Sequence, residues 1–128
     1  MRDTVQSALR KLTRVTRPLA LRSAGKTGSN ISVVRHIGRR SGKAYETPIV
    51  AVGHKEDIWI ALPYGDRTDW LKNVLASGSA DVVIQGENFP VDHPEIVAME
   101  EATGHFRPKE QRLHQRFGVE SALRLHRA

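Results

Sequence analysis

A short basic turn is the stretch of the sequence best suited to chemistry. Residues 38–43 read Gly-Arg-Arg-Ser-Gly-Lys, which places three cations and a hydroxyl between or beside two glycines. Glycines allow a tight turn whose backbone N–H groups can face an anion, and Arg and Lys add charge suited to phosphate or carboxylate. A hairpin turn with solvated charges is the alternative interpretation. The candidate anion-binding residues are Arg39, Arg40, Ser41 and Gly42.

A second stretch, residues 63–70, reads as a loop that enters a helix. The first turn of a helix favours an anion or a polar ring edge. Tyr64 and Trp70 offer flat surfaces for stacking, although a lone Trp on an amphipathic helix is usually a core anchor. Asn73 follows Trp70 by about one turn, so it can hydrogen-bond beside the indole or face water.

The remaining polar residues do not indicate a metal site or a cysteine nucleophile. Cysteine is absent, which excludes a Cys nucleophile and Cys-ligated metals. The six histidines form no ligand pair at helical spacing, so we expect no metal site. His36 precedes the basic turn and is a candidate proton donor or cofactor contact, with a buried structural histidine as the alternative. An enzyme with these residues would take its chemistry from an organic cofactor.

Alternating apolar patterns and turn residues predict the elements that position these stretches. Strands are expected at 31–37, 45–52, 58–62, 81–85 and 89–97, and helices at 68–77 and 108–117. Short connections favour antiparallel pairing, so we predict an α+β fold in which a small antiparallel barrel carries flanking helices.

Particular residues refine these elements. Pro48 favours an edge or bulge position, and residues 86–88 suit a hairpin turn. Gly78 and Gly118 are expected to end the two helices, and Pro108 to begin the second. Residues expected on the buried side of the first helix are Trp70, Leu71, Val74 and Leu75.

Size and composition describe an ordinary globular chain. Its 128 residues correspond to one domain spanning 1–128, with 39% hydrophobic and 27% charged residues. No apolar run is long enough to span a membrane, and the first residues lack a secretory signal. We therefore expect a cytoplasmic protein.

The positive charge gathers at the N-terminal end. Residues 1–45 hold 11 Lys/Arg and one acid, whereas the remainder holds 9 Lys/Arg and 13 acids. This asymmetry indicates an anionic partner, such as a phosphorylated ligand, an anionic membrane surface or nucleic acid. Nucleic acid is the weakest candidate, because aromatic residues make up only 5% of the chain and no reader motif is present.

Residues 1–22 predict a basic amphipathic helix. Apolar residues recur at helical spacing from Val5 to Leu19, basic residues lie opposite, and Pro18 should end or kink the helix. The helix can dock on the core with its basic face in water, or it can lie on an anionic membrane surface.

The motifs together resemble the deazaflavin-dependent nitroreductase family. The resemblance rests on residues 37–43 followed by Thr47-Pro48, and on residues 70–76, which match the Trp–Asn helix of that family. It extends over roughly residues 31–97, about half the chain. Tyr45 stands where the signature often carries a further Arg, and Tyr64 where members often place Lys.

The resemblance implies a split β-barrel and the cofactor F420, a deazaflavin with a phosphate and an acidic tail. Reduced F420 would pass a hydride to a quinone, a nitro compound or an activated double bond. FMN is the alternative cofactor. By position in the motifs, Arg39, Arg40 and Ser41 would meet the anionic tail and the phosphate. The residues expected to border or close the ring site are Pro48, Leu62, Pro63, Tyr64, Gly65, Trp70 and Asn73.

One branch of this family suggests another hypothesis, in which the same barrel binds a fatty acid or other amphiphile at a membrane surface. The basic helix of residues 1–22 fits a peripheral position on the inner face of the membrane. Split barrels often form homodimers, so a homodimer is also expected. The leading hypothesis remains an F420-dependent oxidoreductase.

Overall fold

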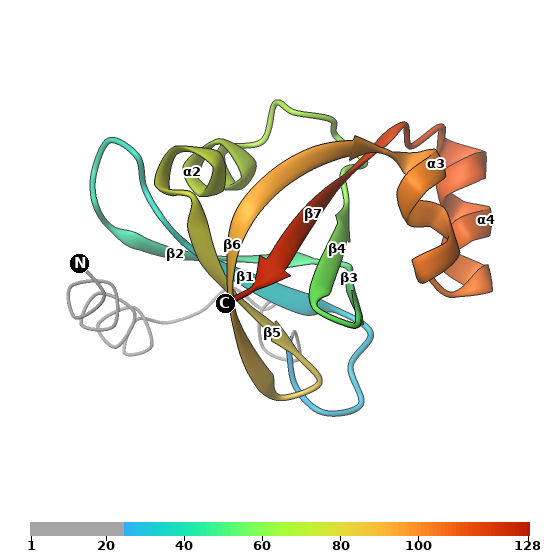
Figure 1. The fold of residues 1–128 in the computed structure, drawn as a ribbon, viewed down its shortest axis with the longest axis horizontal. Coiled ribbons are helices and arrows are strands. Elements are labelled where there is room, and N and C mark those ends of the chain that lie inside the picture. Colours follow the sequence, from blue (N-terminus) through green and yellow to red (C-terminus); the bar gives the residue numbers. More distant parts are fainter. Residues whose placement is uncertain (1–24) are drawn as a thin grey trace.

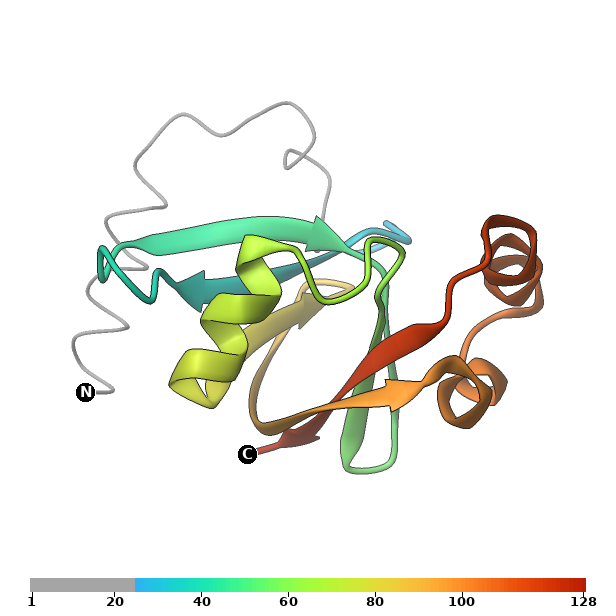
Figure 2. The same ribbon diagram turned by 90° about the horizontal axis from the view of Figure 1, so that it is seen from above.

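The computed structural model describes residues 25–128, which form one curled antiparallel sheet and three flanking helices (Figures 1 and 2). The strands are β1 (Ser32–Ile37), β2 (Ala44–Ile49), β3 (Ala51–His54), β4 (Asp57–Ala61), β5 (Ser79–Ile84), β6 (Glu87–Ala98) and β7 (Ser121–Arg127). The helices are α2 (Asp69–Ser77), α3 (Met99–Ala102) and α4 (Pro108–Phe117), with a 3-10 turn at Thr103–His105. Figure 1 shows α2 on one side of the sheet and α3 with α4 on the other. The predicted α+β fold with an antiparallel split barrel is confirmed.

The strand order explains why the sheet curls. The order is β2-β1-β5-β6-β7-β4-β3, so β2 and β3 are the two edges. Only Val50 separates these strands along the chain. The two edges of the sheet must therefore approach each other at Val50, which gives a half-barrel with a corner at that residue.

This corner corrects one predicted element. A single strand was expected over residues 45–52, but the chain turns at Val50, pairing with β1 before it and with β4 after it. Pro48 lies in the edge strand β2, as its missing N–H predicts.

The structure also contains a strand that the sequence analysis missed. The last predicted element was the helix that ends at residue 117. In the structure a further strand, β7, follows it and lies inside the sheet between β6 and β4. Leu123 and Leu125 are fully buried, while the intervening Arg124 is exposed. Three basic side chains within seven residues hide an alternation that is typical of a half-buried strand.

Strand β4 is buried on both faces and divides the core in two. Ile58 and Ile60 pack inside the barrel with the apolar side of α2. Trp59 and Ala61 face the opposite way and pack against the segment that begins with α3. Each large side chain in these clusters contributes roughly 1.5–3 kcal/mol by leaving water. A short continuous apolar run is the sequence pattern that such a strand requires.

Helix ends follow local chemistry as predicted. Gly78 ends α2 with a φ of 75° and donates its N–H to the carbonyl of Val74. Pro108 is the first residue of α4, and Gly118 ends that helix with a φ of 64°. Only glycine adopts such angles without strain, so these two positions stop the helices.

Two local predictions need correction. The β5–β6 turn consists of Gln85 and Gly86, with φ values of 51° and 80°, rather than residues 86–88. Positive φ at both positions matches the type I′ turn that suits strand twist. Leu75 was expected on the buried side of α2 but is 41% exposed.

The predicted basic helix of residues 1–22 lies outside the described residues. Within residues 25–128, no helix has the length and hydropathy needed to cross a membrane.

Candidate functional site

A cavity of about 810 Å³ opens at the corner where the sheet edges part. Its walls come from the end of β2, the corner at Val50, the end of β4 with the following loop, and α4. Six of the residues predicted for the ring site line it: Pro48, Leu62, Pro63, Tyr64, Gly65 and Trp70. Most of the lining is apolar, so the cavity suits a flat, largely apolar ligand.

Trp70 and Tyr64 take different positions in this wall. Trp70 is 8% exposed and belongs to the barrel core as well as to the cavity lining. The core-anchor interpretation is therefore correct, and the same indole also forms part of the wall. Tyr64 is 77% exposed, so its ring lies where the cavity meets solvent.

A buried hydroxyl lies in the apolar wall. Thr68 lines the cavity just before α2, and its Oγ1 is buried without a hydrogen-bond partner among residues 25–128. An unpaired buried polar atom costs free energy, so this atom is available to a ligand that reaches the first turn of α2.

The basic turn lies between β1 and β2. Gly38 N–H donates to the carbonyl of Lys43 at 2.8 Å, and Gly42 N–H donates to the carbonyl of Gly38 at 2.9 Å. A Cβ on Gly38 would lie 2.6 Å from Ser41 Oγ, so a larger residue cannot occupy this position unchanged. Because several N–H groups of the turn already have acceptors, its free binding capacity is mainly in its side chains.

Asn73 ties this turn to α2. Its Oδ1 accepts from the Arg39 backbone N–H at 3.1 Å and from Arg39 Nη1 at 2.8 Å. Arg39 Nη2 also pairs with Asp69 Oδ1 at 3.3 Å. The structure thus brings the predicted residues Arg39 and Asn73 together, and it adds Asp69, which sequence reasoning did not select.

The orientation of the Asn73 amide determines the state of His36. An arginine only donates, so Oδ1 faces Arg39 and Nδ2 faces His36 Nδ1 at 3.0 Å. His36 Nδ1 must therefore accept, and Nε2 donates to Thr47 Oγ1 at 2.9 Å. Burial lowers the pKa of His36 to about 4, against the opposing effect of the Asp69 carboxylate. His36 is neutral near pH 7, so it acts here as a hydrogen-bond connector.

Thr47 completes a connection between the two predicted stretches. It lines the cavity and also receives the His36 hydrogen bond. A continuous chain of contacts therefore runs from the cavity wall through His36 and Asn73 to Arg39. Its members come from β1, β2, α2 and the basic turn between β1 and β2.

The remaining predicted residues surround this chain without lining the cavity. Arg40, Ser41 and Gly42 are exposed in the turn. The Ser41 hydroxyl lies 3.3 Å from Tyr45 Oη, and the Tyr45 ring stacks on His36 with centroids 5.8 Å apart. The Tyr45 ring thus covers His36.

Comparison with known families decides the assignment. The family model described as F420H(2)-dependent quinone reductase matches residues 9–119. The chain belongs to this family. F420 is accordingly its cofactor, FMN is secondary, and the protein is an F420-dependent reductase.

Solved structures share the fold of this F420-dependent reductase at low sequence identity. An F420-H2 dependent reductase (FDR-A) is 14% identical with a TM-score of 0.57, covering 76% of this chain and 94% of that chain. A structure described as an F420 reductase is 11% identical with a TM-score of 0.52, covering 88% and 96%. A structure described as a domain-swapped dimer is 16% identical with a TM-score of 0.55, covering 94% and 98%. A search of curated protein sequences finds no match.

The residues of this reductase fit F420. The cofactor combines a flat ring with a phosphate and an acidic tail, and the structure combines an apolar cavity with an exposed basic turn. The Thr68 hydroxyl, which has no hydrogen-bond partner among residues 25–128, would offer a hydrogen bond to a ring bound in the cavity. The hydrogen-bonded chain through Asn73 holds turn and cavity in one arrangement.

Sequence reasoning missed the wall that α4 contributes. Glu110, Leu113, His114 and Phe117 line the cavity opposite the predicted residues. His114 is 8% exposed, burial lowers its pKa, and its Nδ1 has no hydrogen-bond partner among residues 25–128. The spacing of these four residues places them on one face of a helix, but nothing local shows that this face meets the barrel corner.

Proposed function

We propose that this reductase passes a hydride from reduced F420 to a quinone held in the cavity beside α4. One observation carries the proposal: a single chain of hydrogen bonds joins the basic turn to the wall of an apolar cavity. A ligand with an anionic tail and a flat ring can therefore occupy both places at once.

The tail of the cofactor is assigned to the exposed cations of the turn. Arg39 already binds Asn73 and Asp69, so it serves mainly to hold the turn in position. Arg40 and Lys43 are exposed and form the more available charge. Charge-assisted contacts to phosphate and carboxylate are stronger than neutral ones.

The ring is assigned to the cavity beside Pro48, Trp70 and the loop of residues 62–65. The apolar walls exclude water, and the Thr68 hydroxyl is placed to hydrogen-bond a polar ring edge. When bound, reduced F420 supplies a hydride.

The acceptor is assigned to the part of the cavity lined by α4. Leu113 and Phe117 present apolar surface there, while His114 offers a buried polar atom. A quinone that receives one hydride and takes one proton from solvent becomes the hydroquinone, so the reaction is balanced. Nitro compounds and activated double bonds are the other acceptor classes to compare.

The double substitution Arg40→Ala/Lys43→Ala tests the tail assignment. We expect the Kd for F420 to rise roughly 10-fold, because two charge-assisted contacts to the cofactor are lost. The rise is limited because each contact lies at an exposed site, where it contributes less binding free energy than a buried one. The measurement is a fluorescence titration of the purified protein with F420. The control Lys109→Ala/Arg112→Ala removes two exposed cations of α4 that do not line the cavity. Equal Kd values for the two double variants would contradict the assignment.

Phe117→Ser tests the acceptor assignment. Phe117 is 71% exposed, so its replacement should change stability little, but the KM for a soluble naphthoquinone should rise roughly 5-fold from lost apolar contact. The Kd for F420 should stay unchanged. Leu75→Ser is the matched control, because Leu75 is exposed on α2 and does not line the cavity. An unchanged KM in Phe117→Ser would contradict the assignment of the acceptor to the part of the cavity beside α4.

Amphiphile binding, membrane attachment and a homodimer remain separate proposals. Membrane attachment depends on residues 1–22, so liposome flotation with and without this segment tests it. Light scattering of the purified chain tests the dimer. Wild-type protein that fails to bind F420 but binds fatty acid would replace the reductase proposal by the amphiphile one.

A further inference from the structure

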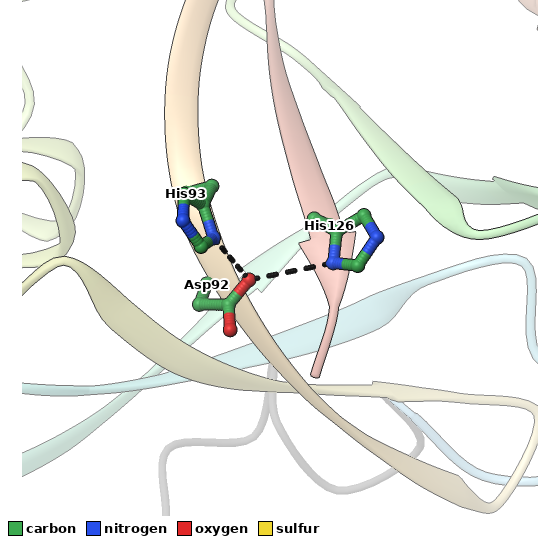
Figure 3. A group of neighbouring side chains, drawn as sticks. All are labelled: Asp92, His93 and His126. Atoms are coloured by element: carbon green, nitrogen blue, oxygen red, sulfur yellow. Dashed lines mark hydrogen bonds and ion pairs between the residues drawn. The ribbon is translucent and has the colours of Figure 1, made fainter.

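A cluster of three potential metal ligands lies away from the cavity (Figure 3). Asp92 and His93 come from β6 and His126 comes from the end of β7. One donor atom from each residue lies within 4.8 Å of the others. None of the three lines the cavity, and the proposed function uses none of them.

An irregularity in β6 brings the first two ligands together. Neighbouring residues of a regular strand point to opposite faces, which would separate Asp92 from His93. Here the register shifts between Asp92 and Glu95, and His93 has a φ of 50°. A bulge re-aims side chains in this way, and His93 Nδ1 lies 2.7 Å from Asp92 Oδ1.

Strand pairing supplies the third ligand. Asp92 and His126 face each other in the β6–β7 register, with His126 Nδ1 3.5 Å from Asp92 Oδ1. Figure 3 shows both imidazoles directed at the same carboxylate. Zinc bound tetrahedrally at about 2.0–2.1 Å holds such donor atoms about 3.3 Å apart. The separation of His126 Nδ1 from Asp92 Oδ1 is close to this value, whereas His93 Nδ1 lies nearer to Asp92 Oδ1 and has to move outward to bind the ion. The exposed His93 side chain is free to adjust.

A second carboxylate lies beside the other ring nitrogen of His126. Glu56 Oε2 lies 3.5 Å from His126 Nε2, on the side of the ring away from Asp92. Metal-binding histidines usually donate their other N–H to a carboxylate, which orients the ring and leaves the facing nitrogen free for the ion. Glu56 is in the position that this arrangement requires.

Nearby cations are engaged elsewhere. Arg124 pairs with Glu95 at 3.8 Å, and the Arg127 guanidinium lies over the Phe89 ring. Asp57 lies opposite His126 in the β4–β7 register, so it adds further negative charge beside the cluster.

We propose that Asp92, His93 and His126 form a binding site for zinc or a similar divalent transition ion. Two imidazoles and one carboxylate are ligands that such ions prefer, and solvent completes the coordination. The bound ion connects the bulge of β6 to the end of β7. The site is independent of the proposed function, because it shares no residue with the cavity.

Calorimetric titration of tag-free, metal-stripped protein with Zn²⁺ tests the proposal. We expect one ion per chain and a higher Tm in its presence, because a ligand that binds only the folded state stabilises it. His93→Gln/His126→Gln should abolish both effects, and Glu56→Gln should weaken binding about 10-fold. The side chains of His93 and Glu56 are largely exposed and that of His126 is about half exposed, so the variants should have a Tm close to that of the wild type in the absence of metal.

His54→Gln is the matched control. His54 is exposed and its ring lies 4.8 Å from that of His105, which makes this pair the competing place for an ion. The control should bind Zn²⁺ like the wild type. Wild-type protein that takes up no Zn²⁺, a double variant that still binds it, or binding that His54→Gln removes would each overturn the proposal.

Discussion

Asn73→Leu is expected to lower the free energy of unfolding by about 3 kcal/mol and to weaken F420 binding at least 10-fold. Asn73 accepts two hydrogen bonds from Arg39 and donates one to His36, which is 5% exposed. A hydrogen bond to a charged group contributes roughly 1.5–3 kcal/mol, and a buried partner left unsatisfied costs roughly 1–3 kcal/mol. Partial exposure of Arg39 lets water recover some of this loss.

The effect on F420 follows from the position of the basic turn. Without Asn73, the Arg39 side chain keeps, among residues 25–128, only its ion pair with the exposed Asp69, so the turn is held less firmly against α2. The cations of the turn must then be ordered when F420 binds. This ordering costs conformational entropy and lowers the affinity for F420. Chemical denaturation and fluorescence titration measure the two effects.

Asn88→Leu is the control for the residue change itself. Asn88 is exposed, and its amide donates to Asp81 Oδ1 at 3.2 Å. This variant should lose less than about 0.5 kcal/mol, as is usual for surface substitutions, and should bind F420 normally. Equal effects of the two variants would refute the connecting role of Asn73.

Acidification is expected to destabilise the protein through His36. Its pKa is about 4 in the folded state, against 6.5 for an ordinary histidine. Between these values the unfolded chain binds more protons than the folded chain, so stability rises with pH. The contribution of His36 is complete above pH 6.5 and is lost progressively as the pH falls toward 4. The loss amounts to about 3 kcal/mol.

The groups in direct contact with His36 among residues 25–128 favour the neutral ring. Asn73 donates to Nδ1, Thr47 accepts from Nε2, and Tyr45 stacks on the ring. Asp69 acts in the opposite direction but more weakly than burial. Protonation would force two donors to face each other at Nδ1.

His36→Gln isolates this contribution, because glutamine cannot titrate. Burial also lowers the pKa of His105 and His114, so every form should lose some stability in acid. The measurement is the free energy of unfolding at several pH values between 4 and 7. The wild type should show the steeper dependence, and parallel curves would contradict the assignment of this pH dependence to His36.

Much of the fold and half of the candidate site were predictable because their causes are local. Gly78, Gly118 and Pro108 act through backbone angles, so they mark helix ends wherever the helices pack. The basic turn and the Trp–Asn pair on α2 are likewise readable from spacing. The hydrogen-bond partners of Asn73 could not be predicted in this way, because they come from β1 and the basic turn, more than thirty residues away along the chain.

The sequence by itself determined the strands other than β7 and the corner at Val50, the helix ends, the basic turn and the loop before α2, since each depends on residues close along the chain. Only the tertiary structure decided where these parts meet. It placed β7 inside the sheet, set α4 as the far wall of the cavity, made His36 a neutral connector, and gathered Asp92, His93 and His126. These features depend on strand pairing and helix docking between residues that are distant along the chain. Such contacts form only in the folded protein, so local sequence patterns do not reveal them.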